Sequence, residues 1–218
     1  GTHYNMYTGS PATGTFNANT IDGITFSTAG STGTIYGIYD ISSGVTMNYT
    51  NNIIRNFSTP GTGSLIGIRE FGVTGNKTIQ NNQVYNFSTS PGGAGGATMT
   101  GISWSAGGPT DDISNNRVYS MNSTGNPGGT GGTIVGIQCS SGTINNIYKN
   151  KVYDLSTNST GGTVWGIQVT AGTTNNIYNN LIGDLRAPFV NSATDGVRGI
   201  NLTTTAASSS INIYYNTI

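Results

Sequence analysis

Two acidic residues occupy equivalent places in successive segments of the chain. Asp40 ends the sequence Gly-Ile-Tyr-Asp, and Glu70 ends the sequence Gly-Ile-Arg-Glu 30 residues later. Two carboxyl groups about 5 Å apart suit a retaining glycosidase, in which one is the acid/base and the other the nucleophile. The same pair could bind a hard cation, although Ca²⁺ needs about six to eight oxygen ligands. Asp40 and Glu70 are therefore the catalytic pair to consider if this protein is an enzyme.

A column of tyrosines is a candidate for binding rather than catalysis. Tyr85, Tyr119 and Tyr153 each follow a valine, and alternation along a strand points them to solvent if the valines point inward. Aromatic faces can pack against sugar rings, and Trp104, at the repeat position of the acidic pair, is a further candidate for contact with a glycan. Stacked tyrosines would also stabilise a sheet, by about 0.2–1 kcal/mol per pair. The sequence leaves both interpretations of the tyrosine column open.

The other charged residues predict surface and turn roles. Asp154 and Asp184 occupy equivalent positions, with Arg186 close by, which predicts a solvated face held by salt bridges. Asp111 and Asp112 follow a proline, which predicts an Asx-type turn or cap. We expect no metal site among these residues.

All of these side chains belong to a repeat that recurs along the chain. Its most regular part runs from Thr143 to Leu155, where Ile147, Asn150, Val152 and Leu155 stand at offsets of zero, three, five and eight. The asparagine recurs at intervals of 30, 34, 34, 30 and 36 residues, as Asn52, Asn82, Asn116, Asn150, Asn180 and Asn216. A second segment carries a Gly-Ile pair in every copy. Self-similarity at such a period predicts a solenoid.

The repeat predicts strands and no helix. Each copy holds short β-rich runs bounded by Gly, Ser, Asn and Thr, and nothing in it has a helical period. We therefore predict an all-β parallel β-helix of about six to seven coils with ~30–36 residues per coil, whose equivalent residues stack ~4.8 Å apart. Residues 1–19 are expected to be an irregular start or part of a preceding coil. Residues 20–218 are expected to be β-helix repeats from a fragment of a longer chain.

The repeated asparagines have a structural interpretation. They lie between apolar positions, so we expect them at an inward-facing corner, where each tolerates a left-handed backbone conformation and bonds to the coils above and below. The apolar positions would form aliphatic and aromatic stacks inside. The loops after each large apolar residue vary in length and are expected to be solvated bulges.

Composition excludes several classes of function. Only 7% of the residues are charged, against about 25% in an average soluble domain, and eight cationic side chains balance eight acidic ones. No positive field attracts nucleic acid, and no apolar run approaches the ~18 residues of a membrane span. Cys139 is the one cysteine, so no intramolecular disulfide can form, and we expect it to be a small buried hydrophobe. No cofactor is expected.

The Gly-Ile strand followed by Asn-Asn-x-Val-x-Asn-Phe, as in residues 81–87, resembles right-handed parallel β-helix repeats of the pectin-lyase-like class. The resemblance covers residues 20–218 and implies a right-handed coil. That class holds lyases, glycosidases, phage tailspikes and non-enzymatic surface proteins, so the resemblance fixes no single activity. The composition, poor in charge and rich in Thr, Gly and Asn, is also similar to repetitive secreted or surface proteins of bacteria. The lyases of the class typically use clustered acidic Ca²⁺ ligands and basic catalytic residues, and this sequence offers no such cluster.

These observations favour a non-enzymatic interpretation. We expect a structural and adhesive segment of an extracellular or bacterial cell-surface protein, serving as a spacer or display surface. Its expected partners are a polysaccharide or cell-surface glycan, and other copies or other segments of the parent protein. The alternative is a carbohydrate-active enzyme, either a glycosidase or a polysaccharide lyase, that uses Asp40 and Glu70.

Overall fold

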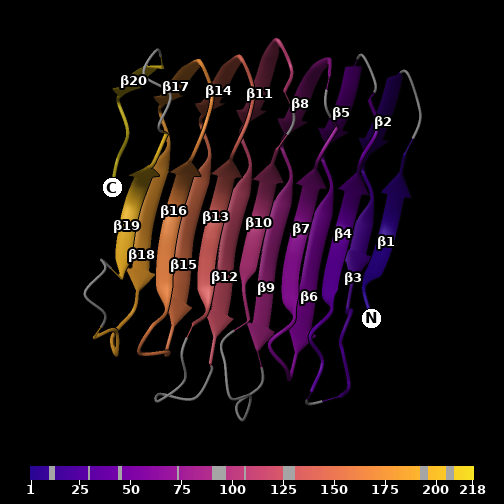
Figure 1. The fold of residues 1–218 in the computed structure, drawn as a ribbon, viewed down its shortest axis with the longest axis vertical. Coiled ribbons are helices and arrows are strands. Elements are labelled where there is room, and N and C mark those ends of the chain that lie inside the picture. Colours follow the sequence, from indigo (N-terminus) through magenta and orange to yellow (C-terminus); the bar gives the residue numbers. More distant parts are fainter. Residues whose placement is uncertain are drawn as a thin grey trace.

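In a computed structural model, the chain winds into a parallel β-solenoid of about six turns (Figure 1). The structure describes residues 1–9, 13–28, 30–43, 46–72, 74–89, 97–105, 107–124, 131–191, 196–204 and 209–218. Parts of the variable loops, including residues 90–96, 125–130 and 192–195, lie outside these ranges. The predicted all-β parallel solenoid is confirmed.

Three parallel sheets form the walls of the solenoid. The first sheet consists of β1 (His3–Thr8), β4 (Thr34–Asp40), β7 (Ser64–Glu70), β10 (Met99–Trp104), β13 (Thr133–Cys139), β16 (Thr163–Val169) and β19 (Val197–Leu202). The second sheet consists of β2 (Thr13–Asn17), β5 (Thr46–Thr50), β8 (Asn76–Gln80), β11 (Thr110–Ser114), β14 (Ile144–Tyr148), β17 (Thr174–Tyr178) and β20 (Ser210–Tyr214). The third sheet consists of β3 (Thr20–Asp22), β6 (Ile53–Thr59), β9 (Gln83–Thr89), β12 (Arg117–Ser123), β15 (Lys151–Thr157) and β18 (Leu181–Arg186).

Residues 1–19 contribute strands to this architecture. β1 pairs with β4 and β2 pairs with β5, so both extend the sheets at one end of the solenoid. None of the described residues forms a helix that is long and apolar enough to cross a membrane.

The Gly-Ile pair recurs because the wall of the solenoid has no room for a side chain at the glycine. In the first sheet the paired register runs through the residues before and after each of these glycines. A Cβ added at Gly101 would lie 2.4 Å from Val118 Cγ1 and 2.6 Å from the carbonyl oxygen of Gly136. The glycine therefore lets the first sheet approach the third sheet closely.

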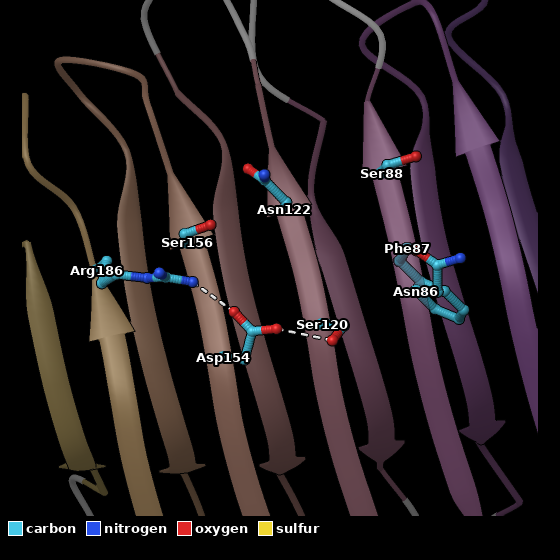
Figure 2. A pocket seen from close by; sticks show the side chains of 8 residues that line it. All are labelled: Asn86, Phe87, Ser88, Ser120, Asn122, Asp154, Ser156 and Arg186. Atoms are coloured by element: carbon cyan, nitrogen blue, oxygen red, sulfur yellow. Dashed lines mark hydrogen bonds and ion pairs between the residues drawn. The ribbon is translucent and has the colours of Figure 1, made fainter.

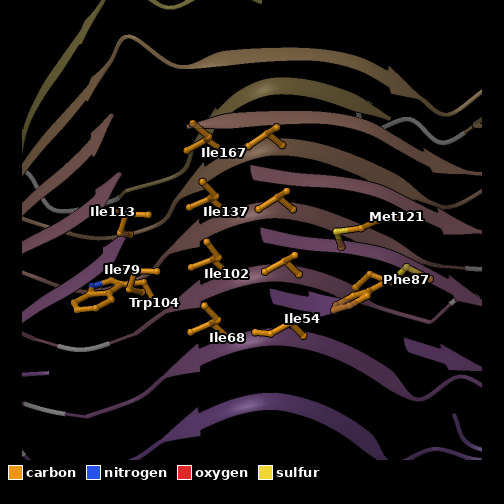
Figure 3. Close-up of a cluster of buried hydrophobic side chains, with 14 of the residues drawn as sticks. Ile54, Ile68, Ile79, Phe87, Ile102, Trp104, Ile113, Met121, Ile137 and Ile167 are labelled. Carbon is orange, nitrogen blue, oxygen red and sulfur yellow. The ribbon is translucent and has the colours of Figure 1, made fainter. Parts of the chain in front are cut away.

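Stacks of equivalent apolar side chains fill the interior (Figure 3). Ile68, Ile102, Ile137 and Ile167 form one column from the first sheet, and all four are fully buried. Phe87 and Met121 belong to a second column from the third sheet, in which the rings of Phe57 and Phe87 stack with centroids 4.8 Å apart. Each turn therefore covers the apolar residues of its neighbours.

The repeated asparagines form a continuous hydrogen-bonded ladder between the second and third sheets. The backbone N–H and Nδ2 of Asn82 both donate to Oδ1 of Asn116 at 3.0 Å, and Nδ2 also donates to the carbonyl of Tyr49 at 2.7 Å. The same bonding links Asn19, Asn52, Asn82, Asn116, Asn150, Asn180 and Asn216 in order.

The left-handed conformation expected of these asparagines belongs to their chain neighbours instead. The residue before each one has a positive φ, as at Asn51, Asn81, Asn115, Lys149, Asn179 and Tyr215. This residue makes the corner, whereas the ladder asparagine directly precedes the next strand and turns its amide inward. Sequence reasoning therefore placed the corner one residue too late.

Candidate functional site

The acidic pair lies inside the solenoid. Asp40 and Glu70 are register partners on β4 and β7, so they are neighbours as the repeat predicted, but both are fully buried. Alternation explains this, because each lies two residues after an inward-facing isoleucine, Ile38 or Ile68. Neither carboxyl group has a solvent-exposed face.

Interior hydrogen bonds occupy these two carboxyl groups. Asp40 accepts hydrogen bonds from the hydroxyl of Tyr49 and from the Ser42 backbone N–H at 2.7 Å. Glu70 accepts one from the Gly72 backbone N–H at 2.9 Å and pairs with the Lys77 ammonium. Burial raises the pKa of Glu70 to about 8 and also raises the pKa of Tyr49.

Asp111 joins the acidic pair in the interior, and the turn predicted for it is wrong. Residues Thr110–Ser114 form strand β11, in which Asp111 is fully buried. Its register partner is Lys77, whose backbone N–H donates to Asp111 Oδ1 at 3.2 Å. Burial raises the pKa of Asp111 to about 7. We call Asp40, Glu70, Lys77 and Asp111 the buried ionic cluster.

The burial of Trp104 removes it from the set of glycan-binding candidates. It is the register partner of Glu70 and Cys139, and its side chain is fully buried (Figure 3). A sugar cannot contact it without opening the wall. Cys139 is buried as expected, and burial raises the pKa of its thiol to about 12.

The tyrosine column does lie on the outer surface of the third sheet. Tyr85, Tyr119 and Tyr153, which we call the tyrosine stripe, are partly exposed and stack with centroids 4.7 and 5.1 Å apart. Arg55 donates to the Tyr85 hydroxyl at 2.9 Å, and Arg117 donates to the Tyr153 hydroxyl at 3.2 Å. The guanidinium of Arg117 also lies over the Tyr119 ring, 5.5 Å from its centroid. The stripe is therefore a rigid surface feature.

Most ring faces within the stripe are already covered. The ring planes are within 7° and 5° of parallel, so neighbouring rings cover one another and present their edges and hydroxyls to solvent. The register partner of Tyr153 in the next turn is Gly183, which has no side chain, and a Cβ built there would have nothing within 4 Å. One face of Tyr153 is thus not covered by a register neighbour, and this is where a flat ligand ring could pack.

A polar pocket of about 260 Å³ lies beside the stripe (Figure 2). Its lining residues are Asn86, Phe87, Ser88, Ser120, Asn122, Asp154, Ser156 and Arg186. Asp154 accepts a hydrogen bond from Ser120 Oγ at 2.7 Å and pairs with Arg186, whose Nε also lies 3.2 Å from Asp184. The salt-bridged face predicted for these aspartates therefore exists, and it forms one wall of the pocket.

Left-handed residues within the strands shape this pocket. Asn86, Ser120 and Asp154 have φ values of 57°, 52° and 54°, and the paired register of the third sheet skips each of them. The strands stay paired one to one on both sides of these residues, so each left-handed residue bends its strand at the same level and re-aims its side chain. Because Ser120 and Asp154 directly follow Tyr119 and Tyr153, the stripe and the pocket form one surface, which we call the third-sheet face.

Sequence reasoning missed two other groups of tyrosines. Tyr148, Tyr178 and Tyr214 stack on the second sheet with centroids 4.9 Å apart at each step, and the recurring Ile-Tyr pair was an available signal for them. Tyr4, Tyr7, Tyr36 and Tyr39 gather on the first sheet. Stacked tyrosines alone are therefore a general device of this solenoid, and what distinguishes the third-sheet face is the pocket beside them.

Comparison with family models, with curated proteins and with solved structures gave no match to this chain. Among the described residues, no group of three or more His, Cys, Asp or Glu side chains is placed to hold a metal ion. The function must therefore be argued from the surface and the interior of the solenoid.

Proposed function

We propose that this chain is a structural and adhesive β-solenoid segment whose third-sheet face binds polysaccharide or another cell-surface glycan. One observation carries the proposal. The ring of Tyr153, one face of which is uncovered, lies next to a pocket lined by hydroxyl, amide, carboxylate and guanidinium groups. A location outside the cell or on a bacterial surface is part of the proposal, because the repeats resemble those of such proteins.

The chemistry of the third-sheet face suits a neutral sugar. The apolar face of a pyranose ring can pack on Tyr153 beside Gly183, where no register neighbour competes for the space. Asp154 then offers acceptors and Arg186 offers donors to adjacent hydroxyl groups, and charged partners strengthen such hydrogen bonds. A pocket of about 260 Å³ can hold one sugar unit of a chain and leave the rest of that chain in solvent.

The enzymatic alternative is less well supported. A glycosidase needs two carboxyl groups that reach the scissile bond from either side. Asp40 and Glu70 have no exposed surface, and hydrogen bonds within the wall hold them there. An adhesive role requires only the outer surface.

Binding to cellulose, mannan and chitin, measured by depletion of the protein from solution, tests the proposal. Tyr153→Ala and Asp154→Ala should each bind about tenfold more weakly than the wild type to the polysaccharide it prefers, a loss of about 1.4 kcal/mol. The matched control is Tyr178→Ala, which removes a ring from the second-sheet stack and should leave binding unchanged.

A gain-of-stacking variant separates binding from folding. Gly183→Tyr should extend the stripe over Tyr153, so binding should be lost while the unfolding temperature is maintained or raised. Equal losses in Tyr153→Ala and Tyr178→Ala, or full binding by Gly183→Tyr, would contradict the proposed site. Hydrolysis of a bound polysaccharide that is lost in Glu70→Gln would favour the enzyme instead.

A further inference from the structure

Charged side chains meet inside the solenoid where the first sheet leads into the second. The buried ionic cluster contains three carboxyl groups, of Asp40, Glu70 and Asp111, and one ammonium group, of Lys77. All four residues are at most 1% exposed. Ions enclosed in this way lose the solvation of water, and their mutual attraction only partly restores it. A reaction that converts charged groups of the buried ionic cluster into neutral ones is therefore favoured.

Lys77 and Glu70 are in contact across the turn that joins β7 to β8. Lys77 Nζ lies 3.4 Å from Glu70 Oε1, and both side chains are 0% exposed. A Cβ at Gly72 would lie 2.8 Å from Glu70 Oε1 and 3.1 Å from Lys77 Nζ, so the glycine provides the space in which the two groups meet. An amine and a carboxyl group held together at about 3–3.5 Å have the proximity that condensation requires.

The two oxygens of Glu70 have different surroundings. Oε1 accepts the Gly72 backbone N–H at 2.9 Å, whereas Oε2 is buried and has no hydrogen-bond partner within the described part of the chain. A backbone N–H aimed at Oε1 would stabilise the negative charge that develops there when the carboxyl carbon is attacked. Oε2 is then the oxygen that can leave.

Asp111 is placed to receive a proton. It is the register partner of Lys77 on β11, and its Oδ1 accepts the Lys77 backbone N–H. Its Oδ2 is buried without a hydrogen-bond partner among the described residues. The Asp111 carboxyl group also interacts electrostatically with the Lys77 ammonium, so it could take the proton that must leave before the neutral amine can attack.

We propose that Lys77 and Glu70 condense spontaneously to an intramolecular amide, with Asp111 as the proton acceptor. The Lys77 ammonium passes one proton to the Asp111 carboxylate. The resulting amine attacks Cδ of protonated Glu70, so the C–N bond forms and the bond from Cδ to Oε2 breaks. Oε2 leaves as water with the proton of the acid and a second proton from the amine. No oxidant or reductant is needed, and the positive and negative charges both disappear.

The protonation states suit this sequence of steps. Burial raises the pKa of Glu70 to about 8, so that near neutral pH it is mainly the neutral acid that an amine can attack. Burial raises the pKa of Asp111 to about 7, so a substantial fraction is ionised and can accept a proton. After condensation, Oε1 is an amide oxygen and keeps its hydrogen bond to Gly72.

Mass spectrometry of the intact protein tests the amide directly. The purified wild type should be lighter than its sequence mass by one water molecule. Trypsin should fail to cut after Lys77, so that residues 70–117 appear as one dehydrated peptide in place of a peptide ending at Lys77. A wild-type protein at its full sequence mass after prolonged incubation at neutral pH would overturn the proposal.

Variants identify the two partners, and their masses can be read whether or not the variant is as stable as the wild type. Lys77→Met should have its full sequence mass, whereas the matched control Lys151→Met, which removes an exposed lysine, should still lose water. Glu70→Gln should lose ammonia in place of water, because the side-chain amide nitrogen of glutamine then leaves as ammonia. Asp111→Asn should lose water more slowly. Loss of water from Lys77→Met, or from Glu70→Gln, would contradict the assignment.

Discussion

Single residues with positive φ make the corners between the second and third sheets. Four of the six corners that precede a ladder asparagine from Asn52 onward are themselves asparagines, which tolerate this conformation better than other side chains. Lys149 and Tyr215 adopt it with φ values of 56° without that tolerance. The corner geometry is therefore imposed by the neighbouring turns at these two places.

The left-handed backbone conformation of Lys149 leads to a prediction about stability. Lys149→Asn should raise the free energy of unfolding by about 0.5–1 kcal/mol, because the left-handed conformation costs asparagine less than lysine. The side chain of Lys149 is exposed, so little packing is lost. Denaturation by guanidinium chloride measures the change, and the reverse substitution at the equivalent exposed corner, Asn115→Lys, should cost a similar amount. A destabilised Lys149→Asn would show that the corner is not strained.

The positions of the acidic residues could have been inferred from the sequence. If Ile38 points inward, alternation directs Asp40 inward as well, and Cys139 at the same repeat position was already expected to be buried. The usual exposure of carboxylates argued the other way. Nothing in the sequence indicated that Lys77, on the next strand of the same turn, is buried against Glu70, since this contact depends on the corner geometry and not on the repeat.

At the scale of elements, the spacing between the first and third sheets depends on a column of glycines. The residues Gly37, Gly67, Gly101, Gly136, Gly166 and Gly199 each occupy the position where an added Cβ would strike the aliphatic residue opposite. The repeat period predicted the strands well, because a shift of register in one turn would displace every side chain stacked on it. The pocket could not be predicted, because it depends on the left-handed backbone of Ser120 and Asp154, whose sequence signal is weak.

This close approach predicts a large effect from one methyl group. Gly101→Ala should lower the free energy of unfolding by about 1–3 kcal/mol, the usual cost of overpacking a core. Its Cβ would meet a backbone carbonyl as well as Val118, so Val118→Ala should restore only part of the loss. Gly183→Ala is the matched control, since nothing lies within 4 Å of its Cβ, and it should be close to neutral. Similar effects of the two substitutions would argue against a tight contact between the first and third sheets at Gly101.

At the scale of the whole molecule, the outer surface carries few charges and the interior carries an unusual share of them. The 218 residues include eight acidic and eight basic side chains, and three of the acidic ones, Asp40, Glu70 and Asp111, are buried in the interior. Surface ion pairs contribute little to stability in such a protein. The dependence of its stability on pH should therefore come mainly from the buried carboxyl groups.

The direction of that dependence follows from the raised pKa values. Folded Asp111 keeps its proton up to a pKa of about 7, whereas the unfolded chain releases it near 3.8. Between these values unfolding releases a proton, so the free energy of unfolding should fall, by on the order of a few kcal/mol, as the pH rises from about 4 to 7.

Urea denaturation at several pH values measures this slope. In molecules where Glu70 has not formed an amide, its carboxyl group should make the free energy of unfolding fall further over this pH range, because burial raises its pKa to about 8. Asp111→Asn should make the slope shallower, and a free energy of unfolding that rises over this range would contradict the enclosed carboxyl groups.

The asparagine ladder also gives the rod a direction. Along it, each side-chain amide donates to the asparagine in the turn with the higher residue numbers and accepts from the one in the turn with the lower numbers, so the amide dipoles add along the axis. Hydrogen bonds arranged head to tail in this way polarise one another. Two such rods could continue each other's ladder only with the same orientation, so growth along the axis would give a polar filament and not a closed pair.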